Sequence, residues 1–135
     1  MTKDEKAVLD ANDAFYAAFA AREPEVMDRL WAKRAPVACV HPGWSPLRGR
    51  DEVVASWHGI LSGGGAPPIS CSRATAHLLG DAAYVICIEH VPGGLLVATN
   101  TFVREDGEWR LVHHHAGPLM RPIEEPDAPQ GETMH

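Results

Sequence analysis

The strongest constraint on the fold lies between residues 95 and 118, where Asp106-Gly107 separates two runs of alternating apolar and polar residues. A type I′ turn needs positive φ at both central positions, and Asp-Gly between β-rich runs is a strong signal for this turn. We therefore predict an antiparallel hairpin. Because side chains alternate with period two along a strand, the hairpin also predicts which residues share a face.

Counting outward from a two-residue loop gives the expected register of this hairpin. The pairs expected on one face are Arg104 with Trp109, Phe102 with Leu111, Asn100 with His113, and Ala98 with His115. This face has an aromatic and aliphatic floor that ends in Asn100, His113 and His115. We therefore expect a pocket with a polar end. His114 is expected on the opposite face, with a structural or interface role.

Period-two alternation begins near residue 69 and predicts four strands, over residues 69–79, 82–91, 95–105 and 108–116. Their short connections make sequential neighbours antiparallel, which predicts a four-stranded meander. Even-length turns place Cys87 beside Asn100 on the pocket face. They also place Glu89 on this face, beside Ala98, whereas a three-residue loop over residues 92–94 would turn Glu89 away.

The other face of these strands is too apolar to face water, because a sheet with one solvated face alternates apolar and polar residues. It carries Tyr84, Ile86, Ile88, Leu95, Val97, Thr99, Thr101 and Val103. No predicted helix is left to cover this face. We expect a homodimer that packs sheet against sheet through it.

Helical periodicity dominates the first half of the chain. Thr2 and Glu5 have the spacing of a capping box, and an apolar stripe with helical period follows them. Pro24 suits the first turn of a second short helix, and a third helix is expected between Gly49 and the glycines at 63–65. A short apolar run before the third helix, over residues 35–40, is expected to form a strand. Three helices followed by a meander predict an α+β domain, with the helices packed on a curved, mostly antiparallel sheet.

Several side chains of this half are candidates to line the pocket. Tyr16 lies on or beside the apolar stripe of the first helix, where it is either a core aromatic or a pocket residue. His41 and Trp44 belong to the turn-rich segment HPGWSP, where they either rim a cavity or plug it. Trp57 belongs to the expected inner face of the third helix.

Composition limits the functions open to such a domain. The 135 residues fit one domain, and a formal net charge of −6 disfavours nucleic-acid and anionic-membrane partners. Cys39, Cys71 and Cys87 have no CxxC spacing, so buried free thiols are expected in preference to a disulfide or a catalytic thiol. With no apolar leader and no apolar run of ~20 residues, we expect a cytoplasmic protein. The domain is expected over residues 1–118, followed by a proline-rich tail over 119–135.

The chain also resembles a known family. The resemblance is carried above all by the segment TNTFVREDGEWRLVHHHAG, and also by HPGW, GRDEV and GDAAYV. Over about residues 4–118 the chain resembles the SnoaL-like branch of the nuclear transport factor 2-like superfamily. That superfamily includes ketosteroid isomerase, scytalone dehydratase, polyketide cyclases and the association domain of calcium/calmodulin-dependent kinase II. The resemblance implies a sheet wrapped round the first helix, a conical cavity and a dimer. By the same resemblance, the association domain carries a pocket arginine at the place of Asn100, which supports the choice of inner face. With asparagine there, this chain lacks the positive charge with which that arginine could bind a carboxylate.

Acid-base chemistry is one interpretation of the polar end. His113 is the candidate general base, because imidazole titrates near neutrality and Asn100 across the strand could hold its tautomer. Tyr16 is the candidate hydrogen-bond donor, by resemblance to the phenol of ketosteroid-isomerase-like proteins. Metal binding is disfavoured, because only two histidines are placed on one face and zinc sites need three or four ligands. We expect neither a metal nor a cofactor.

Three functions fit these features. The first is a domain that binds a small apolar or cyclic molecule, with contacts at Asn100, His115, Glu89, Trp57, Trp44, His41 and Phe102. The second is a cofactor-independent isomerase, dehydratase or cyclase with His113 as base and Tyr16 as donor. The third is a dimerisation module whose cavity is filled by its own side chains. We place binding first, because the cavity has more support than the acid-base pair.

Overall fold

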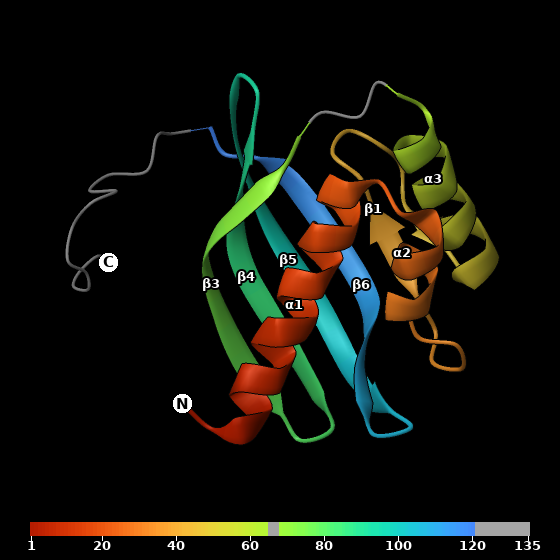
Figure 1. Cartoon of the computed structure of the whole chain (residues 1–135). Helices are drawn as coiled ribbons and strands as arrows, with labels where there is room; N and C mark the ends of the chain where they lie inside the picture. Colours follow the sequence, from red (N-terminus) through yellow and green to blue (C-terminus); the bar gives the residue numbers. More distant parts are fainter. Residues whose placement is uncertain (65–67, 121–135) are drawn as a thin grey trace.

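The computed structural model describes residues 1–64 and 68–120, and in it three helices cover one face of a six-stranded sheet (Figure 1). The expected proline-rich tail lies, from residue 121 onward, outside the described residues. The elements are α1 (Lys3–Ala21), α2 (Pro24–Leu30), β1 (Ala38–Val40), β2 (Leu47–Arg48), α3 (Arg50–Ser62), β3 (Ser70–Leu79), β4 (Ala82–Val91), β5 (Gly94–Glu105) and β6 (Glu108–Pro118). This architecture confirms the predicted α+β class. No helix among the described residues is long and apolar enough to cross a membrane.

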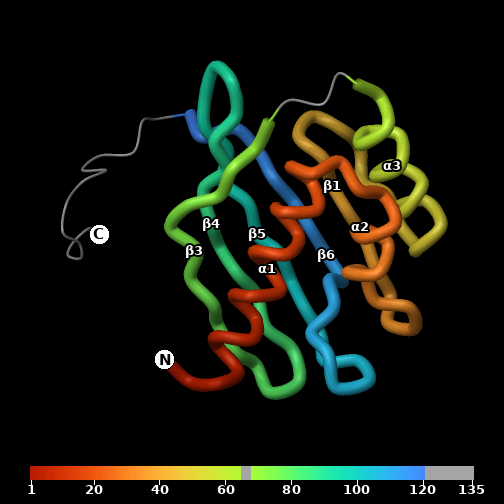
Figure 2. The backbone as a smooth tube through the Cα atoms, in the orientation of Figure 1, coloured from red at the N-terminus to blue at the C-terminus, as the bar shows by residue number. Residues whose placement is uncertain are grey.

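Helix α1 begins at the predicted capping box. The Thr2 side chain accepts a hydrogen bond from the backbone N–H of Glu5, and the Glu5 carboxylate accepts one from the backbone N–H of Thr2. These two bonds satisfy N–H groups that the first turn of a helix leaves without partners. Val8 and Phe15 of the apolar stripe are fully buried, and the helix is capped by Arg22 in the left-handed conformation. Figure 2 shows α1 crossing the strands on the inner face.

Helices α2 and α3 are joined by one guanidinium group. Pro24 occupies the first turn of α2, as predicted, and Asp51 and Glu52 lie in the first turn of α3. At the start of α3, the Arg50 side chain donates hydrogen bonds to the backbone carbonyls of Asp28, Trp31 and Ala32 at 2.9, 2.9 and 3.0 Å. Carbonyls at a helix C-terminus lack intrahelical partners, so Arg50 satisfies them and fixes the two helices together.

The sheet contains two strands more than the predicted meander. Strands β3 to β6 form that meander, and the strand order is β2-β1-β6-β5-β4-β3. The apolar run predicted over residues 35–40 forms strand only from Ala38, and it pairs parallel with β6. Strand β2 then pairs antiparallel with β1. Short turns predict pairing only between strands that follow one another in the sequence. They do not predict the parallel pairing of β1 with β6, because these strands are more than seventy residues apart.

The predicted hairpin β5–β6 is present, and its first pairs follow the predicted register. Asp106 and Gly107 both have positive φ, and Phe102 lies opposite Leu111. Beyond this pair the register shifts, so that Thr101 lies opposite His113 and Val112 is the additional residue of a β-bulge. The predicted pairing of Asn100 with His113 is therefore wrong.

The bulge reverses the facing of the residues that follow it in β6. Asn100 lies opposite His114, and Ala98 lies opposite Ala116. His114 is buried, whereas His113 is half-buried and His115 is exposed. The prediction that His113 and His115 face the helices is wrong, and so is the placement of His114 on the outer face. One extra residue in a strand is sufficient to exchange its two faces.

Strand β4 has the predicted faces with a different register. Val91 pairs with Gly94 across a two-residue loop, so Glu89 and Cys87 face inward as expected for an even-length turn. Their partners are Leu96 and Ala98, which are two residues from the predicted ones. A shift of two residues keeps every side chain on its face.

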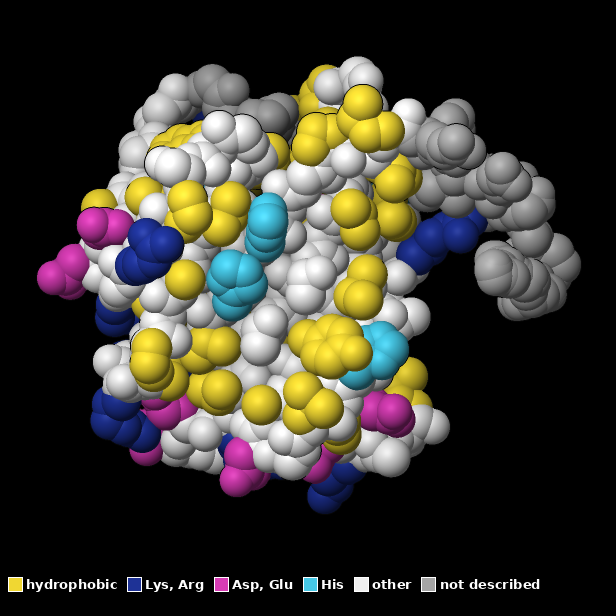
Figure 3. All heavy atoms as spheres, turned by 180° about the vertical axis from the view of Figure 1, so that it is seen from behind, with side chains coloured by type: hydrophobic (Ala, Val, Ile, Leu, Met, Phe, Trp, Pro, Cys, Tyr) yellow, Lys and Arg dark blue, Asp and Glu magenta, His cyan; other side chains and the backbone are white. Residues whose placement is uncertain are grey.

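The outer face of the sheet is rich in apolar side chains. Ile86 and Val97 are 40% and 37% exposed there. Figure 3 shows this face from behind, with hydrophobic and histidine side chains gathered over the sheet and most charged side chains toward its edges. Unlike the inner face, it is not covered by a helix in the described chain (Figure 1).

Candidate functional site

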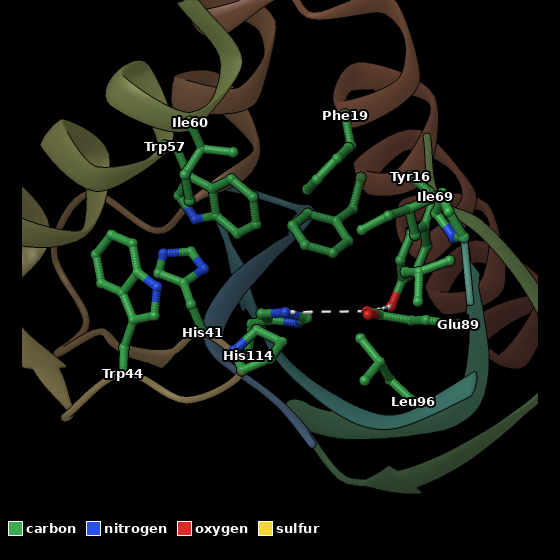
Figure 4. Close-up of a pocket in the computed structure, with 14 residues that line it drawn as sticks. Tyr16, Phe19, His41, Trp44, Trp57, Ile60, Ile69, Glu89, Leu96 and His114 are labelled. Atoms are coloured by element: carbon green, nitrogen blue, oxygen red, sulfur yellow. Dashed lines mark hydrogen bonds and ion pairs between the residues drawn. The ribbon is translucent and has the colours of Figure 1, made fainter. Parts of the chain in front are cut away.

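A cavity of about 420 Å³ opens between the helices and the inner face of the sheet (Figure 4). Helices α1 and α3, the loop after β1, and strands β4, β5 and β6 all contribute to it. Its lining residues are Phe15, Tyr16, Phe19, His41, Pro42, Trp44, Trp57, Ile60, Ile69, Glu89, Val91, Pro92, Leu96 and His114. Among these described residues there is no lysine or arginine. The cavity is thus mostly apolar, with a few polar groups that converge in it, which is typical of small-molecule sites.

Aromatic rings form the wall of the cavity on the helix side. Trp57 packs edge to face against Phe15 and Phe19, with ring centroids 5.4 and 5.6 Å apart. His41 packs between Trp57 and Trp44, at 4.6 and 4.7 Å from the two indole centroids. Trp57 is 1% exposed and Trp44 is 48% exposed, so this row of rings runs from the core to the surface. Such edge-to-face pairs fix ring orientation as well as burying apolar area.

Two buried ionisable side chains meet at the floor of the cavity. Nε2 of His114 and Oε2 of Glu89 are 3.9 Å apart, and both side chains are at most 4% exposed. The phenol of Tyr16, from α1, donates a hydrogen bond of 2.6 Å to the same Glu89 oxygen. Figure 4 shows the three side chains converging from α1, β4 and β6. The distance between His114 and Glu89 is too long for a hydrogen bond between them.

Asn100 orients the polar side chains at the floor of the cavity through hydrogen bonds. Its amide nitrogen donates to Oδ1 of Asn12 at 2.8 Å and to the Tyr16 oxygen at 3.1 Å. Its amide oxygen lies 2.6 Å from Nδ1 of His114. An amide oxygen only accepts, so with this amide orientation Nδ1 of His114 carries the proton and donates. Nε2 of neutral His114 therefore presents a lone pair to the cavity.

Burial sets the charges of these groups. Desolvation lowers the pKa of His114 to about 3, so this imidazole is neutral at pH 7. Desolvation also lowers the pKa of His41 to about 4. The pKa of Glu89 is raised by burial, against the opposing effect of the Tyr16 hydrogen bond. Burial, followed by the nearby Glu89 charge, raises the pKa of Tyr16, which keeps its phenol protonated as a donor.

The structure brings together most of the residues that the sequence analysis selected. Tyr16, Glu89, Trp57, Trp44 and His41 all line the cavity. Two further selected residues, Asn100 and Phe102, are 0% and 1% exposed and are not among the lining residues. Asn100 acts on the site through hydrogen bonds, and Phe102 belongs to the hydrophobic core.

His113 and His115 are not part of this site. They lie on the outer face of the sheet with their rings 6.2 Å apart, and Nδ1 of His113 is 3.1 Å from the carbonyl oxygen of Ala38. The residue missed by the sequence analysis is His114. Its place in a run of three histidines pointed to this region, but facing depended on a bulge that the local sequence does not mark. No group of three or more His, Cys, Asp or Glu side chains in residues 1–64 and 68–120 is arranged to hold a metal ion.

Comparisons with known proteins find SnoaL-like and NTF2-like relatives. A family model described as a SnoaL-like domain matches residues 8–121. A solved structure from Streptomyces avermitilis, described as a candidate dehydratase from the NTF2-like family, is 34% identical with a TM-score of 0.79, and the match covers 87% of this chain and 97% of that one. A structure from Thiobacillus denitrificans, described as a candidate calcium/calmodulin-dependent protein kinase type II association domain, is 36% identical with a TM-score of 0.72, covering 82% and 93%.

A plant protein also matches. The F-box protein SKIP8 of Arabidopsis thaliana is 27% identical over 117 residues, which are 85% of this chain and 51% of that protein. The chain therefore spans about half the length of this curated relative.

Proposed function

The chain belongs to the family of SnoaL-like domains, within the NTF2-like superfamily, and we propose that its cavity binds a small, mostly apolar organic molecule. The polar end of this ligand lies between Glu89 and His114. The observation that carries the proposal is the buried pair at the floor of a mostly apolar cavity of about 420 Å³. Burying two such groups costs free energy unless they gain partners, and a ligand that supplies a partner recovers part of that cost.

Binding of the neutral fluorescent ketone prodan tests this proposal. We expect saturable binding with a blue shift of its emission, because the dye leaves water for an apolar site. Leu96 lines the cavity, so Leu96→Trp should fill it and weaken binding at least tenfold. Leu79→Trp is the matched control, because Leu79 is 62% exposed at the end of β3 and is not among the lining residues. A folded Leu96→Trp variant that binds prodan as well as wild type would contradict the proposal.

Proton transfer of the isomerase or dehydratase type is the second candidate function. It is favoured by the burial of Glu89, which raises the pKa of this carboxylate and makes it a stronger base than an exposed one, and by the uncharged Nε2 of His114 at 3.9 Å. Tyr16 donates its one O–H to Glu89 instead of to a ligand, and Glu89 takes the role of base expected for His113. The 34% identical neighbour described as a candidate dehydratase also supports it.

Hydrogen exchange on a bound ketone tests proton transfer. Prodan carries exchangeable hydrogens next to its carbonyl, so we expect the protein to accelerate their exchange for deuterium in heavy water, as measured by mass spectrometry. Glu89→Gln should remove the acceleration without abolishing binding, because the amide keeps the size of the side chain but is no base. An exchange rate for bound prodan equal to that in buffer would count against this function.

We further propose that two copies of the chain pair through the outer face of the sheet. Exposed Ile86 and Val97 support this, because apolar patches rimmed by polar groups commonly mark interfaces. The 36% identical structure described as a candidate association domain also supports self-association. Sedimentation velocity should give a dimer at micromolar concentration, and Val97→Lys should give a monomer. A wild-type chain that sediments as a stable monomer would refute the pairing.

A further inference from the structure

The polar floor of the cavity offers acceptors in excess of donors. Nε2 of His114 carries a lone pair, and among the described residues no donor lies within hydrogen-bonding distance of it. The carboxylate of Glu89 accepts one hydrogen bond, from Tyr16. Both groups line the cavity, so a ligand that satisfies them has to bring N–H or O–H donors. Prodan has no such donor, so its binding reports the apolar part of the cavity and not these two acceptors.

The spacing of these acceptors suits a single donor atom. Oε2 of Glu89 and Nε2 of His114 are 3.9 Å apart. A nitrogen about 2.9 Å from each of two acceptors can bridge any separation below roughly 5.8 Å, so one atom can reach both. Such an atom needs at least two hydrogens. A ketone or ether oxygen has none, and a hydroxyl has one.

Charge narrows the class of ligand further. Among the described residues that line the cavity, Glu89 is the one acidic side chain, and no lysine or arginine accompanies it. A carboxylate or phosphate ligand would meet this acid without a compensating cation, which is costly at a buried site. A cation would be attracted to Glu89, and the aromatic rings in the lining favour a cation over an anion.

We propose that the cavity selects an organic amine, with an ammonium group donating to both Glu89 and His114 and an apolar skeleton among the aromatic rings. This inference rests on the proposed binding function and adds the chemical class of the ligand. The ammonium is held by one charged and one neutral hydrogen bond, and its carbon skeleton replaces water against Phe19, Ile60 and Leu96.

Three ligands with the same ring system test the inference by calorimetry at pH 7. They are 2-(1-naphthyl)ethylamine, 2-(1-naphthyl)ethanol and 1-naphthylacetate, which present a cation, a hydroxyl and an anion. We expect the amine to bind at least tenfold more tightly than the alcohol, and the acetate to bind most weakly. Glu89→Gln should bring the amine within about twofold of the alcohol. Glu108→Gln, at an exposed position of the neighbouring hairpin, is the matched control and should keep the full preference.

The outcomes separate the two proposals. An alcohol that binds wild type as tightly as the amine, or an acetate that binds more tightly, overturns the amine inference and leaves the binding function standing. If none of the three ligands binds and prodan does not bind either, both proposals fail. The ranking is measured on the wild-type protein, so it stands even if Glu89→Gln does not fold.

Discussion

The carboxylate of Glu105, at the end of β5, is expected to stabilise the fold as an anion. It accepts backbone hydrogen bonds from Lys33, Arg34 and Ala35 at 2.8, 3.0 and 3.1 Å. These three residues belong to the segment that leads from α2 into β1, so Glu105 ties this segment to the central hairpin. Glu105→Gln preserves the size of the side chain but replaces one accepting oxygen with a donor. At least one of the three N–H groups then loses its acceptor.

The magnitude follows from the ionisation of the same group. The three backbone N–H groups lower the pKa of Glu105 from 4.5 to about 2, with the hydrogen bond from Lys33 as the largest cause. Since one pKa unit corresponds to about 1.4 kcal/mol, this shift corresponds to at most ~3.5 kcal/mol of stability. Solvent screening near the end of β5 reduces the expected contribution to about 2 kcal/mol.

The sign of the pH dependence is set by the lowered pKa. A carboxylate whose pKa is lower in the folded state stabilises the protein fully above about pH 4.5 and loses this contribution as the pH falls toward 2. Urea denaturation of wild type and Glu105→Gln at pH 6 should therefore differ by about 2 kcal/mol, and at pH 2.5 the difference should largely disappear. Glu108→Gln, on the same hairpin, should match wild type at both values. A gap between wild type and Glu105→Gln that is unchanged at pH 2.5 would refute the reasoning.

Two further substitutions test the supports of the site and of the helix layer. Asn100→Leu leaves Nδ1 of His114 without its acceptor, so we expect a loss of about 2 kcal/mol in urea denaturation and at least tenfold weaker prodan binding by fluorescence. Equal prodan affinity would show that the hydrogen bond does not organise the cavity. Arg50→Ala removes the side-chain hydrogen bonds to three backbone carbonyls and should cost about 2 kcal/mol, with partial recovery in Arg50→Lys; an unchanged denaturation midpoint would contradict the joining role.

Much of the fold was predictable because it depends on local chemistry. Asp106-Gly107 supplies the positive φ of a hairpin turn, and Thr2 with Glu5 closes the first turn of α1. Periods of two and 3.6 residues separate the strands from the helices. Tyr16 was within reach because it lies on or beside the apolar stripe of its own helix, whereas the facing of Glu89 depended on the even length of the loop between β4 and β5.

The centre of the site was not predictable in this way. Asn100 binds Asn12 and Tyr16, which precede it by 88 and 84 residues, and these hydrogen bonds exist only after the helix is packed on the sheet. The parallel pairing of β1 with β6 is also a long-range contact. Neither leaves a periodic signal in the sequence, because each depends on where separate elements meet.

The sequence alone determined that a hairpin with an asparagine and three consecutive histidines would lie under the helices. Tertiary structure alone decided which histidine faces the cavity. The physical reason is the bulge at Val112: an extra residue exchanges the two faces of every later position, and its place in the strand is chosen by packing. With the bulge at Val112, Leu111 is buried in the core, and His114 contacts Asn100 and lines the cavity.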